Sequence, residues 1–395
     1  MRVRLLNTIL VTTLTGACAP GRATAPTPRA AVTQRSLQQR LTAFAHDSMM
    51  GREAATVWNE RATAYISAQF RALGVEPAGE GGTYFQLVPG VTSRDLTGRP
   101  IDSRNVIGII RGSDPMLRGE FVSITAHNDH IGFNHHPVDH DSLRAFNAII
   151  RPLGADSRPH PPSPDEAREI RRALDSLRAI REPRLDSIYN GADDDGSGTV
   201  ALIEIAQAFA NTGARTRRSI LLVSHTAEEE GLLGSAWFTD HPTVALDSIV
   251  AEIDLDMIGR GAAADIAKGG PGYLEVVGLR RLSKEFGDWF EAVNAREPLP
   301  FEFDYEYDAP GHPEQYYCRA DHYNYARYGI PSVSLSRGSH RDYHQVTDES
   351  QYIDYPDYTR LVQMVLDAAI FVANAEHRPQ LDVAKPANPH MPCRQ

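Results

Sequence analysis

The sequence predicts a single large α/β domain with a mixed, mostly parallel central sheet, helices on both faces of that sheet, and one helical insertion. Two observations support this fold class. From residue 104 onward, short apolar segments alternate with segments of helical periodicity, a pattern typical of a sheet that is parallel at its centre. In addition, 42% of the 395 residues are apolar and 23% are charged, so the chain can bury a sizeable core.

Helical periodicity and apolar runs define the predicted elements in chain order. Segments 35–46 and 58–73 have helical periodicity, and Gly74 follows the second segment as a C-cap. Beyond Gly74, apolar runs predict strands and the segments between them predict helices. These are strands at 105–110, 121–126, 219–224, 249–255 and 332–335, and helices at 198–211, 232–239, 281–293, 321–328 and 356–375.

The N-terminus is predicted to be an export signal. The basic start Met1–Arg4 precedes a mostly apolar stretch that is too short to stay in a bilayer as an anchor. The segment Leu14–Cys18 resembles a lipoprotein cleavage box, and plain cleavage is the alternative. We therefore expect a periplasmic or outer-membrane-anchored lipoprotein, or a secreted protein. The expected organisation is a signal peptide at 1–18, a disordered tether at 19–34, the folded domain at 35–384 and a tail at 385–395.

An insertion at 133–188 interrupts the alternation of strands and helices. It contains His135, His136 and His140, and a charged segment at 165–181 with apolar residues on one face, which predicts an inserted amphipathic helix. The insertion leaves the sheet just after His127 and returns just before the Asp193–Asp195 run. We therefore expect it to lie over the mouth of any site formed there. A surface projection to one side is the alternative, because insertions in loops are generally tolerated.

Charge and cysteine content exclude several classes of protein. Lys and Arg number 40 against 51 Asp and Glu, for a net charge of −11, and no dense basic run occurs beyond the first four residues. A nucleic-acid partner is therefore not expected, and membrane contact is expected only through a lipid on Cys18. Three cysteines are too few for a disulfide scaffold or a thiolate zinc site. Cys318 and Cys393 remain open as a pair, which would require their Cα atoms to lie within about 7 Å.

Polar residues follow the predicted core strands at the point where each strand ends. In a largely parallel sheet, ligands bind outside the carboxyl ends of the strands, so these side chains are expected to form a site. They are His127, Asp129 and His130 after the strand at 121–126, His225 and Glu228–Glu230 after 219–224, Asp256 after 249–255, and Tyr343 and His344 after 332–335, with Asp193–Asp195 before the helix at 198–211.

Each of these residues also has an ordinary structural explanation. His127 could be a buried histidine with a hydrogen-bond partner, and Asp193–Asp195 could cap the following helix. Glu228–Glu230 could interact with a helix N-terminus. Asp256 is harder to explain because it ends an apolar strand, where an unpaired carboxylate is costly. Carboxylates so close together would repel one another without a cation, so the set as a whole indicates a metal.

The residue types favour zinc in a catalytic site. Histidine with Asp and Glu, and without a thiolate, is a typical catalytic zinc set. The sequence lacks a His-Glu-x-x-His helix, a Gly-x-Ser-x-Gly turn and a Gly-rich phosphate loop. The Asp193–Gly198 run is not an EF-hand loop, because Gly191 stands where the first calcium ligand belongs.

Five motifs, in this order, resemble the di-zinc aminopeptidases of metallopeptidase family twenty-eight. The resemblance covers roughly residues 40–375 and implies a zinc-exopeptidase-like fold. This chain departs from the family in the long interval between His127 and Asp194, which the insertion causes and which puts substrate preference in doubt. The motifs are His127-x-Asp129, Gly191–Gly198, Ala227–Ser235, Asp254–Gly259 and Tyr343-His344, with Gly51-Arg52-Glu53, Asp321-His322 and Gly329–Pro331 in addition.

The resemblance also implies a role for each site residue. Glu228 would be the general base acting on a metal-bridging water, and Asp129 the carboxylate that orients the ligand His127. Tyr343 would place its hydroxyl near the reacting carbonyl. The implied metal ligands, for Zn²⁺ at two ions per chain, are His127, Asp194, Glu229, Asp256 and His344, with Asp194 bridging the two ions.

The expected function is therefore exported, zinc-dependent hydrolysis of the N-terminal bond of peptides that have a free N-terminus. A glutaminyl-cyclase-like acyltransferase, a carboxypeptidase or dipeptidase of the same family, and a non-catalytic lipoprotein on the same fold are the alternatives. Retention of both His127 and His344 speaks against the cyclase, and retention of Glu228 speaks against a non-catalytic protein.

Overall fold

The computed structural model describes residues 31–94, 97–158 and 160–395. The predicted signal segment and Cys18 lie outside these residues. The helix predicted from residue 35 begins at Gln34, where the Thr33 side chain caps it by accepting a hydrogen bond from the Ser36 N–H. Within the described ranges, no helix combines the length and the apolar character needed to cross a bilayer.

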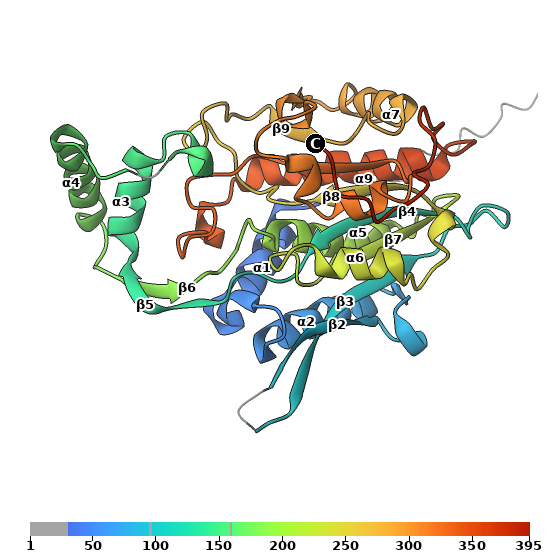
Figure 1. Ribbon diagram of the computed structural model, residues 1–395, viewed down its shortest axis with the longest axis horizontal. Coiled ribbons are helices and arrows are strands. Elements are labelled where there is room, and N and C mark those ends of the chain that lie inside the picture. Colours follow the sequence, from blue (N-terminus) through green and yellow to red (C-terminus); the bar gives the residue numbers. More distant parts are fainter. Residues whose placement is uncertain (1–30, 95–96, 159) are drawn as a thin grey trace, which may run out of the picture.

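The helices and strands confirm the predicted α/β class and add elements to it (Figure 1). Helices predicted at 35–46, 58–73, 198–211 and 356–375 are present within a few residues of the expected bounds. The helices are α1 Gln34–Phe44, α2 Val57–Ala72, α3 His140–Ile150, α4 Pro164–Arg178, α5 Gly196–Thr212, α6 Leu233–Asp240, α7 Lys284–Asn294, α8 His322–Ala326 and α9 Tyr355–Asn374. The strands are β1 Glu76–Pro77, β2 Phe85–Arg94, β3 Pro100–Ile110, β4 Phe121–His127, β5 Phe133–Asp139, β6 Leu185–Ile188, β7 Ser219–His225, β8 Ile249–Leu255, β9 Tyr273–Val277, β10 Glu302–Asp304 and β11 Ser332–Ser336.

The main sheet is parallel at its centre, as predicted. Among the described residues it has nine strands in the order β1-β3-β7-β4-β8-β11-β9-β10, with β2 also paired to β3. The central strands β7, β4, β8 and β11 are mutually parallel, whereas β3 and β9 are antiparallel to their inner neighbours. His127 at the end of β4 pairs in register with His225 at the end of β7. The residues that follow the parallel strands therefore emerge at one edge.

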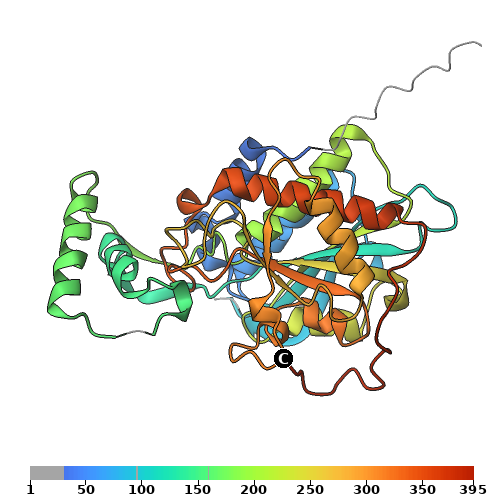
Figure 2. The same ribbon diagram turned by 90° about the horizontal axis from the view of Figure 1, so that it is seen from above.

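Side chains alternate between the two faces of the sheet along each strand. The central strands have apolar residues on both faces, and helices cover both. On β7, Ile220 and Leu222 point into the larger core with α1, α2, α5, α7 and α9, while Leu221 and Val223 point into a smaller core with α6 and α8. Seen from above, α9 crosses over the strands (Figure 2). The central strands β4, β7 and β8 are buried along their whole length, so they form a rigid support for the loops that follow them.

The insertion at 133–188, hereafter the arm, is a separate projection. It begins with β5 and ends with β6, which pair antiparallel, and it contains α3 and α4. The predicted amphipathic helix at 165–181 corresponds to α4, which ends before the 77% exposed Ile180, whereas α3 was not predicted. Figures 1 and 2 both show the arm extending to one side of the main body.

The C-terminal tail is fastened to the body. A disulfide joins Cys318, next to α8, to Cys393, with 5.8 Å between the Cα atoms. The pair that the sequence left open is therefore formed. The Gln395 side chain also accepts a hydrogen bond from the Tyr317 N–H at 3.0 Å.

Candidate functional site

Five separate segments of the chain meet beyond the carboxyl ends of the central strands. His127 is the last residue of β4, and Asp256 directly follows β8. Glu229 lies in the loop after β7, Asp194 in the loop before α5, and His344 in the loop after β11. The predicted metal ligands are far apart in sequence, yet their carboxylate and imidazole atoms lie within 4 Å of at least one other member of the set.

Asp194 lies between two groups of donor atoms. Its Oδ1 is 3.2 Å from His127 Nε2, and its Oδ2 is 3.1 Å from His344 Nε2. On the first side, Asp256 Oδ1 is 3.8 Å from His127 Nε2; on the second, Glu229 Oε2 is 3.1 Å from His344 Nε2. Donors that share one zinc ion lie roughly 3.3 Å apart, given bonds of about 2.0–2.1 Å and tetrahedral angles. The separations therefore suit two metal positions that share Asp194.

The neighbouring Asp195 also faces this region, but its carboxylate binds the backbone. One of its oxygens accepts a hydrogen bond from the His127 N–H at 3.0 Å, and the other accepts one from the Gly198 N–H at 2.8 Å. It thereby caps α5 and fixes the end of β4. Although Asp195 lies within 4.8 Å of the His127 and Asp256 donor atoms, Asp194 is the better placed bridging carboxylate.

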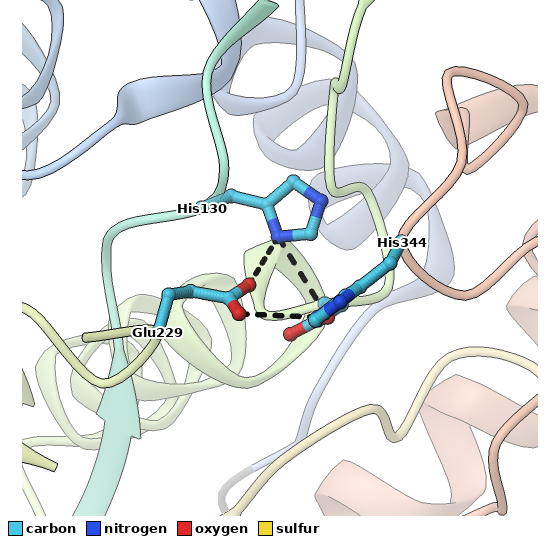
Figure 3. A group of neighbouring side chains, drawn as sticks. His130, Glu229 and His344 are labelled. Carbon is cyan, nitrogen blue, oxygen red and sulfur yellow. Dashed lines mark hydrogen bonds and ion pairs between the residues drawn. The ribbon is translucent and has the colours of Figure 1, made fainter. Parts of the chain in front are cut away.

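His130 belongs to the second group, although the sequence-based ligand set omits it. Its Nδ1 lies 2.6 Å from Glu229 Oε1 and 3.7 Å from Asp194 Oδ2 (Figure 3). The residue is 1% exposed. The sequence places His130 in the run His127–His130 at a strand end, which could have indicated a site residue. However, nothing in the sequence distinguishes a histidine that faces the site from one that faces solvent.

Glu228 and Tyr343, predicted as general base and hydroxyl donor, line one cavity with four of the five predicted ligands. Burial raises the pKa of Glu228 well above its usual value, and the negative charges of Asp256 and Asp321 raise it further. The Tyr343 ring stacks on the His344 ring with 3.9 Å between centroids. The cavity is lined by Asp194, Glu228, Glu229, Asp256, Met257, Glu275, Val277, Tyr316, Arg319, Ala320, Ser334, Ser336, Ser339, Tyr343 and His344.

Asp129 lies beside His127, as predicted, but its carboxylate contacts a second loop more closely. The His127 Nδ1 is 3.2 Å from the Asp129 backbone oxygen and 3.7 Å from its carboxylate. The carboxylate instead accepts hydrogen bonds from the N–H groups of Glu228 at 3.2 Å and Glu229 at 3.4 Å. Asp129 therefore links the loop after β4 to the loop after β7.

The remaining predicted polar residues lie around the donor groups. The carboxylate of Asp193 accepts a hydrogen bond from the Gly259 N–H at 2.6 Å, so it supports the loop after β8. His225 is buried and its Nε2 is 3.0 Å from the Tyr325 hydroxyl, which leaves it on the α8 side of the sheet. Glu230 is exposed to solvent.

The electrostatics of the cluster favour positive charge among the carboxylates. Burial lowers the pKa of His127, but the surrounding carboxylates, Asp129 and Asp194 foremost, raise it well above its usual value. Burial also lowers the pKa of His344, but its contacts with Asp194 and Glu229 raise that pKa to about 10. A metal cation would supply the same positive charge.

The donor atoms fit a zinc site in a further respect. His127 Nε2, Asp194 Oδ2 and Asp256 Oδ1 are buried, and none has a hydrogen bond of good geometry to the described residues. Buried polar groups normally have such partners, so these atoms are suited to a ligand. Imidazole nitrogens and carboxylate oxygens without thiolates are the donors found in catalytic zinc sites.

Two buried residues hold the loops that carry these donors. The Arg52 guanidinium, which is fully buried, donates hydrogen bonds to the backbone oxygens of Asn128, Asn190 and Gly191. The Asp348 carboxylate accepts hydrogen bonds from the N–H of Asp193 and from the N–H of Asp194, at 3.0–3.1 Å. The candidate bridging carboxylate is thus fixed through its own backbone.

The arm borders the cavity without covering it. The residues that line the cavity in the described part of the chain include none from the arm. The arm instead contacts the loop after β11: Arg144 binds Asp342 at 2.9 Å, and the Ala155 N–H donates to the Ser339 oxygen at 2.9 Å. Since Ser339 lines the cavity, the arm lies beside its wall. The expectation that the arm lies over the mouth was wrong because the β5–β6 pair directs it sideways.

Comparison with known proteins gives one family and several relatives. Residues 105–369 match the Peptidase family M28. A curated protein from Aspergillus oryzae, named probable leucine aminopeptidase 2, is 29% identical over 159 residues. That segment is 38% of this chain and 28% of the Aspergillus protein, so the chain spans less than a third of that relative's length.

Solved structures share the fold at low sequence identity. A Zn-dependent exopeptidase from Parabacteroides distasonis is 18% identical, with a TM-score of 0.53 over 87% of this chain and 99% of the other. A glutaminyl cyclase from Porphyromonas gingivalis is also 18% identical, with a TM-score of 0.55 over 85% and 97% of the two chains. These likenesses establish the zinc-exopeptidase-like α/β fold, which proteins of different activities share.

Proposed function

Because this chain belongs to peptidase family M28, we propose that it is an exported, zinc-dependent aminopeptidase that removes the N-terminal residue of peptides. The observation that carries this proposal is the position of Asp194, whose two carboxylate oxygens face two separate groups of nitrogen and oxygen donors. The aminopeptidase name of the Aspergillus relative and the zinc named for the Parabacteroides structure support the same activity and metal.

In this proposal the chain holds two zinc ions at the edge of the sheet. When bound, the zinc pair would polarise the scissile carbonyl and lower the pKa of the attacking water. His127 and Asp256 would hold one ion and Glu229 and His344 the other, with Asp194 shared between them.

The other site residues would act on protons and orientation. Glu228, which lines the cavity beside the ligands, would take a proton from the attacking water and pass it to the leaving amine. Tyr343 would donate its hydroxyl to the carbonyl oxygen of the bound substrate. Asp129 would keep Glu228 and Glu229 in place through their backbone N–H groups.

Export is proposed from the first 18 residues and is supported by the disulfide between Cys318 and Cys393, because disulfides persist in oxidising compartments. We further propose a lipid on Cys18. Mass spectrometry of the mature N-terminus tests both proposals. An unmodified start beyond residue 18 would refute the lipid, and an intact Met1 in the mature protein would refute the cleavage.

The activity is tested by incubating the zinc-loaded protein with matched free and N-acetylated peptides and measuring released amino acids. An aminopeptidase releases the first residue only from the free peptides, and Glu228→Gln should slow that release roughly 10²–10⁴-fold. Release from the C-terminus, or equal cleavage of acetylated peptides, would contradict the proposal.

The same panel distinguishes the two alternative activities. A peptide beginning with Gln would lose ammonia without losing a residue if the chain were a cyclase, the activity named for the Porphyromonas structure. A carboxypeptidase or dipeptidase would use a cationic group for the substrate carboxylate. Among the described residues that line the cavity, Arg319 is the one arginine, and it is about half exposed, so no cluster of arginines favours this alternative.

A further inference from the structure

His130 has no role in the proposed mechanism, yet it lies within the candidate metal site. It is 1% exposed, and its Nδ1 points at the Glu229 carboxylate (Figure 3) and lies 3.7 Å from Asp194 Oδ2. Its Nε2 has no hydrogen bond to the described residues, so Nδ1 makes the polar contact of this ring. His130 could therefore be a further metal ligand, or it could hold a ligand in position.

Distances distinguish these two roles. Glu229 Oε2 and Asp194 Oδ2 each lie 3.1 Å from His344 Nε2, close to the roughly 3.3 Å expected for two donors on one zinc ion. The 2.6 Å between His130 Nδ1 and Glu229 Oε1 is too short for two donors on one ion, and it is close to the roughly 2.7–2.9 Å of a charge-assisted N–H···O hydrogen bond. The two oxygens of Glu229 thus have different partners.

We infer that His130 is a positioning residue that donates its Nδ1–H to Glu229 Oε1 and so directs Glu229 Oε2 toward the metal position it shares with Asp194 and His344. This inference rests on the proposed zinc-dependent function. Hydrogen-bond partners of ligating carboxylates orient the ligand, and their loss typically weakens metal binding 10–100-fold.

The loop after β4 holds both the backbone and the side chain of Glu229. Asp129 binds the Glu229 backbone N–H, and His130 binds its carboxylate. The His130 ring packs on Gly191, where a Cβ would lie 2.6 Å from the ring atoms, and its edge contacts the His344 ring at 5.6 Å between centroids. The ring therefore has little freedom to turn away.

The test measures zinc binding to the metal-free, full-length protein by competition with a chromophoric chelator, which resolves two dissociation constants. His130→Ala should weaken one zinc about 10–100-fold and leave the other within about threefold. His130→Asn should recover most of the loss, because its amide nitrogen can replace Nδ1 as a donor. His225→Ala is the matched control: His225 is equally buried, belongs to none of the groups of described residues that could hold a metal, and its Nε2 contacts the Tyr325 hydroxyl at 3.0 Å on the α8 side of the sheet, so both constants should stay unchanged.

Three results would overturn the inference. If both zinc dissociation constants were unchanged in His130→Ala, His130 would have only a structural role. An Asn variant as weak as the Ala variant would make the ring a direct ligand, since an amide nitrogen does not bind zinc. If His130→Ala bound neither zinc ion and the metal-free variant had a lower thermal midpoint, the substitution would have caused general misfolding. Absence of zinc binding in the unaltered protein would be the separate failure of the proposed function.

Discussion

Glu228, Glu229 and Glu230 are sequence neighbours that occupy three different environments. Glu228 lines the cavity, Glu229 lies against two histidines, and Glu230 is exposed. An acidic surface patch would make the three interchangeable. The structure separates them because Asp129 holds the backbone of the first two and leaves the third outside its hydrogen bonds.

Single Glu→Gln variants should therefore differ sharply. Glu228→Gln removes the proton acceptor but keeps the size of the side chain, so turnover should fall roughly 10²–10⁴-fold with zinc content unchanged. Glu229→Gln should lose zinc together with activity, because a neutral amide replaces a charged ligand. Glu230→Gln should change neither. Zinc analysis and peptide turnover measure all three, and equal behaviour at 228 and 230 would contradict the assignment.

A second residue-scale prediction concerns Arg52, a buried cation that binds three backbone oxygens in the loops before Asp129 and Asp194. Burial lowers its pKa to about 10, so it remains charged at neutral pH. Arg52→Met leaves these oxygens without their donor and should reduce the free energy of unfolding by about 3 kcal/mol or more. Arg61→Met, which removes one exposed hydrogen bond to the Ser48 oxygen, should cost under about 1 kcal/mol in the same denaturant titration. Similar losses in both variants would contradict this role.

The sequence predicted much of the site because its residues follow buried strands. His127 and Asp256 end apolar runs, and parallel strands bring such ends to one edge. The same reasoning could not assign His130, whose role depends on the direction of one side chain, nor Arg52, whose partners are backbone oxygens far away in sequence. Long-range contacts of this kind leave no local pattern.

At the scale of elements, strands with a largely apolar run were predicted, and strands with charged or polar residues in their middle were not. The strands at 121–126, 219–224 and 249–255 have continuous apolar runs and are present. β2, β9 and β10 were missed because polar or charged residues interrupt their apolar runs, as Glu275 does in β9. α3 was missed because its buried face includes the polar residues His140, Asp141 and Asn147, which interrupt the apolar periodicity of a helix.

The junction between the arm and the loop after β11 is predicted to weaken in acid. Despite burial, Arg260 and Arg144 hold the pKa of Asp342 well below its usual value, and His140 and Arg184 lower that of Glu349. A carboxylate with a depressed pKa in the folded state stabilises it fully above the unfolded-state pKa of about 4, and this contribution is lost as the pH falls through the folded-state value.

Hydrogen exchange measures this junction directly. After correction for the intrinsic pH dependence, amides of α3 and of the loop at 339–352 should lose protection below about pH 4 before the central strands do. Glu349→Gln should remove part of this pH dependence. Equal protection of the junction and the sheet across that range would contradict the prediction.

For the whole molecule, the five candidate ligands come from five segments, so metal binding should stabilise the entire fold. Each zinc at 100 times its dissociation constant adds about 2.7 kcal/mol to the free energy of unfolding. We expect two zinc ions per chain and a clear drop in the thermal midpoint after treatment with a chelator, reversed by added zinc. One ion with full activity, or an unchanged midpoint, would contradict the shared role of Asp194.

The disulfide between Cys318 and Cys393 makes the stability of the fold depend on whether these two thiols are oxidised. Cys318 and Cys393 are 75 positions apart, and the covalent ring that they close contains β11, α9 and the segment with His344. Closing a ring of this size removes enough entropy from the unfolded chain to stabilise the fold by about 4 kcal/mol. In a reducing cytoplasm that contribution is missing, and it is comparable to a large part of a domain's net stability of about 5–15 kcal/mol. If the chain is exported as proposed, it would therefore be easiest to unfold, and so easiest to pass through a translocation channel, before its thiols oxidise.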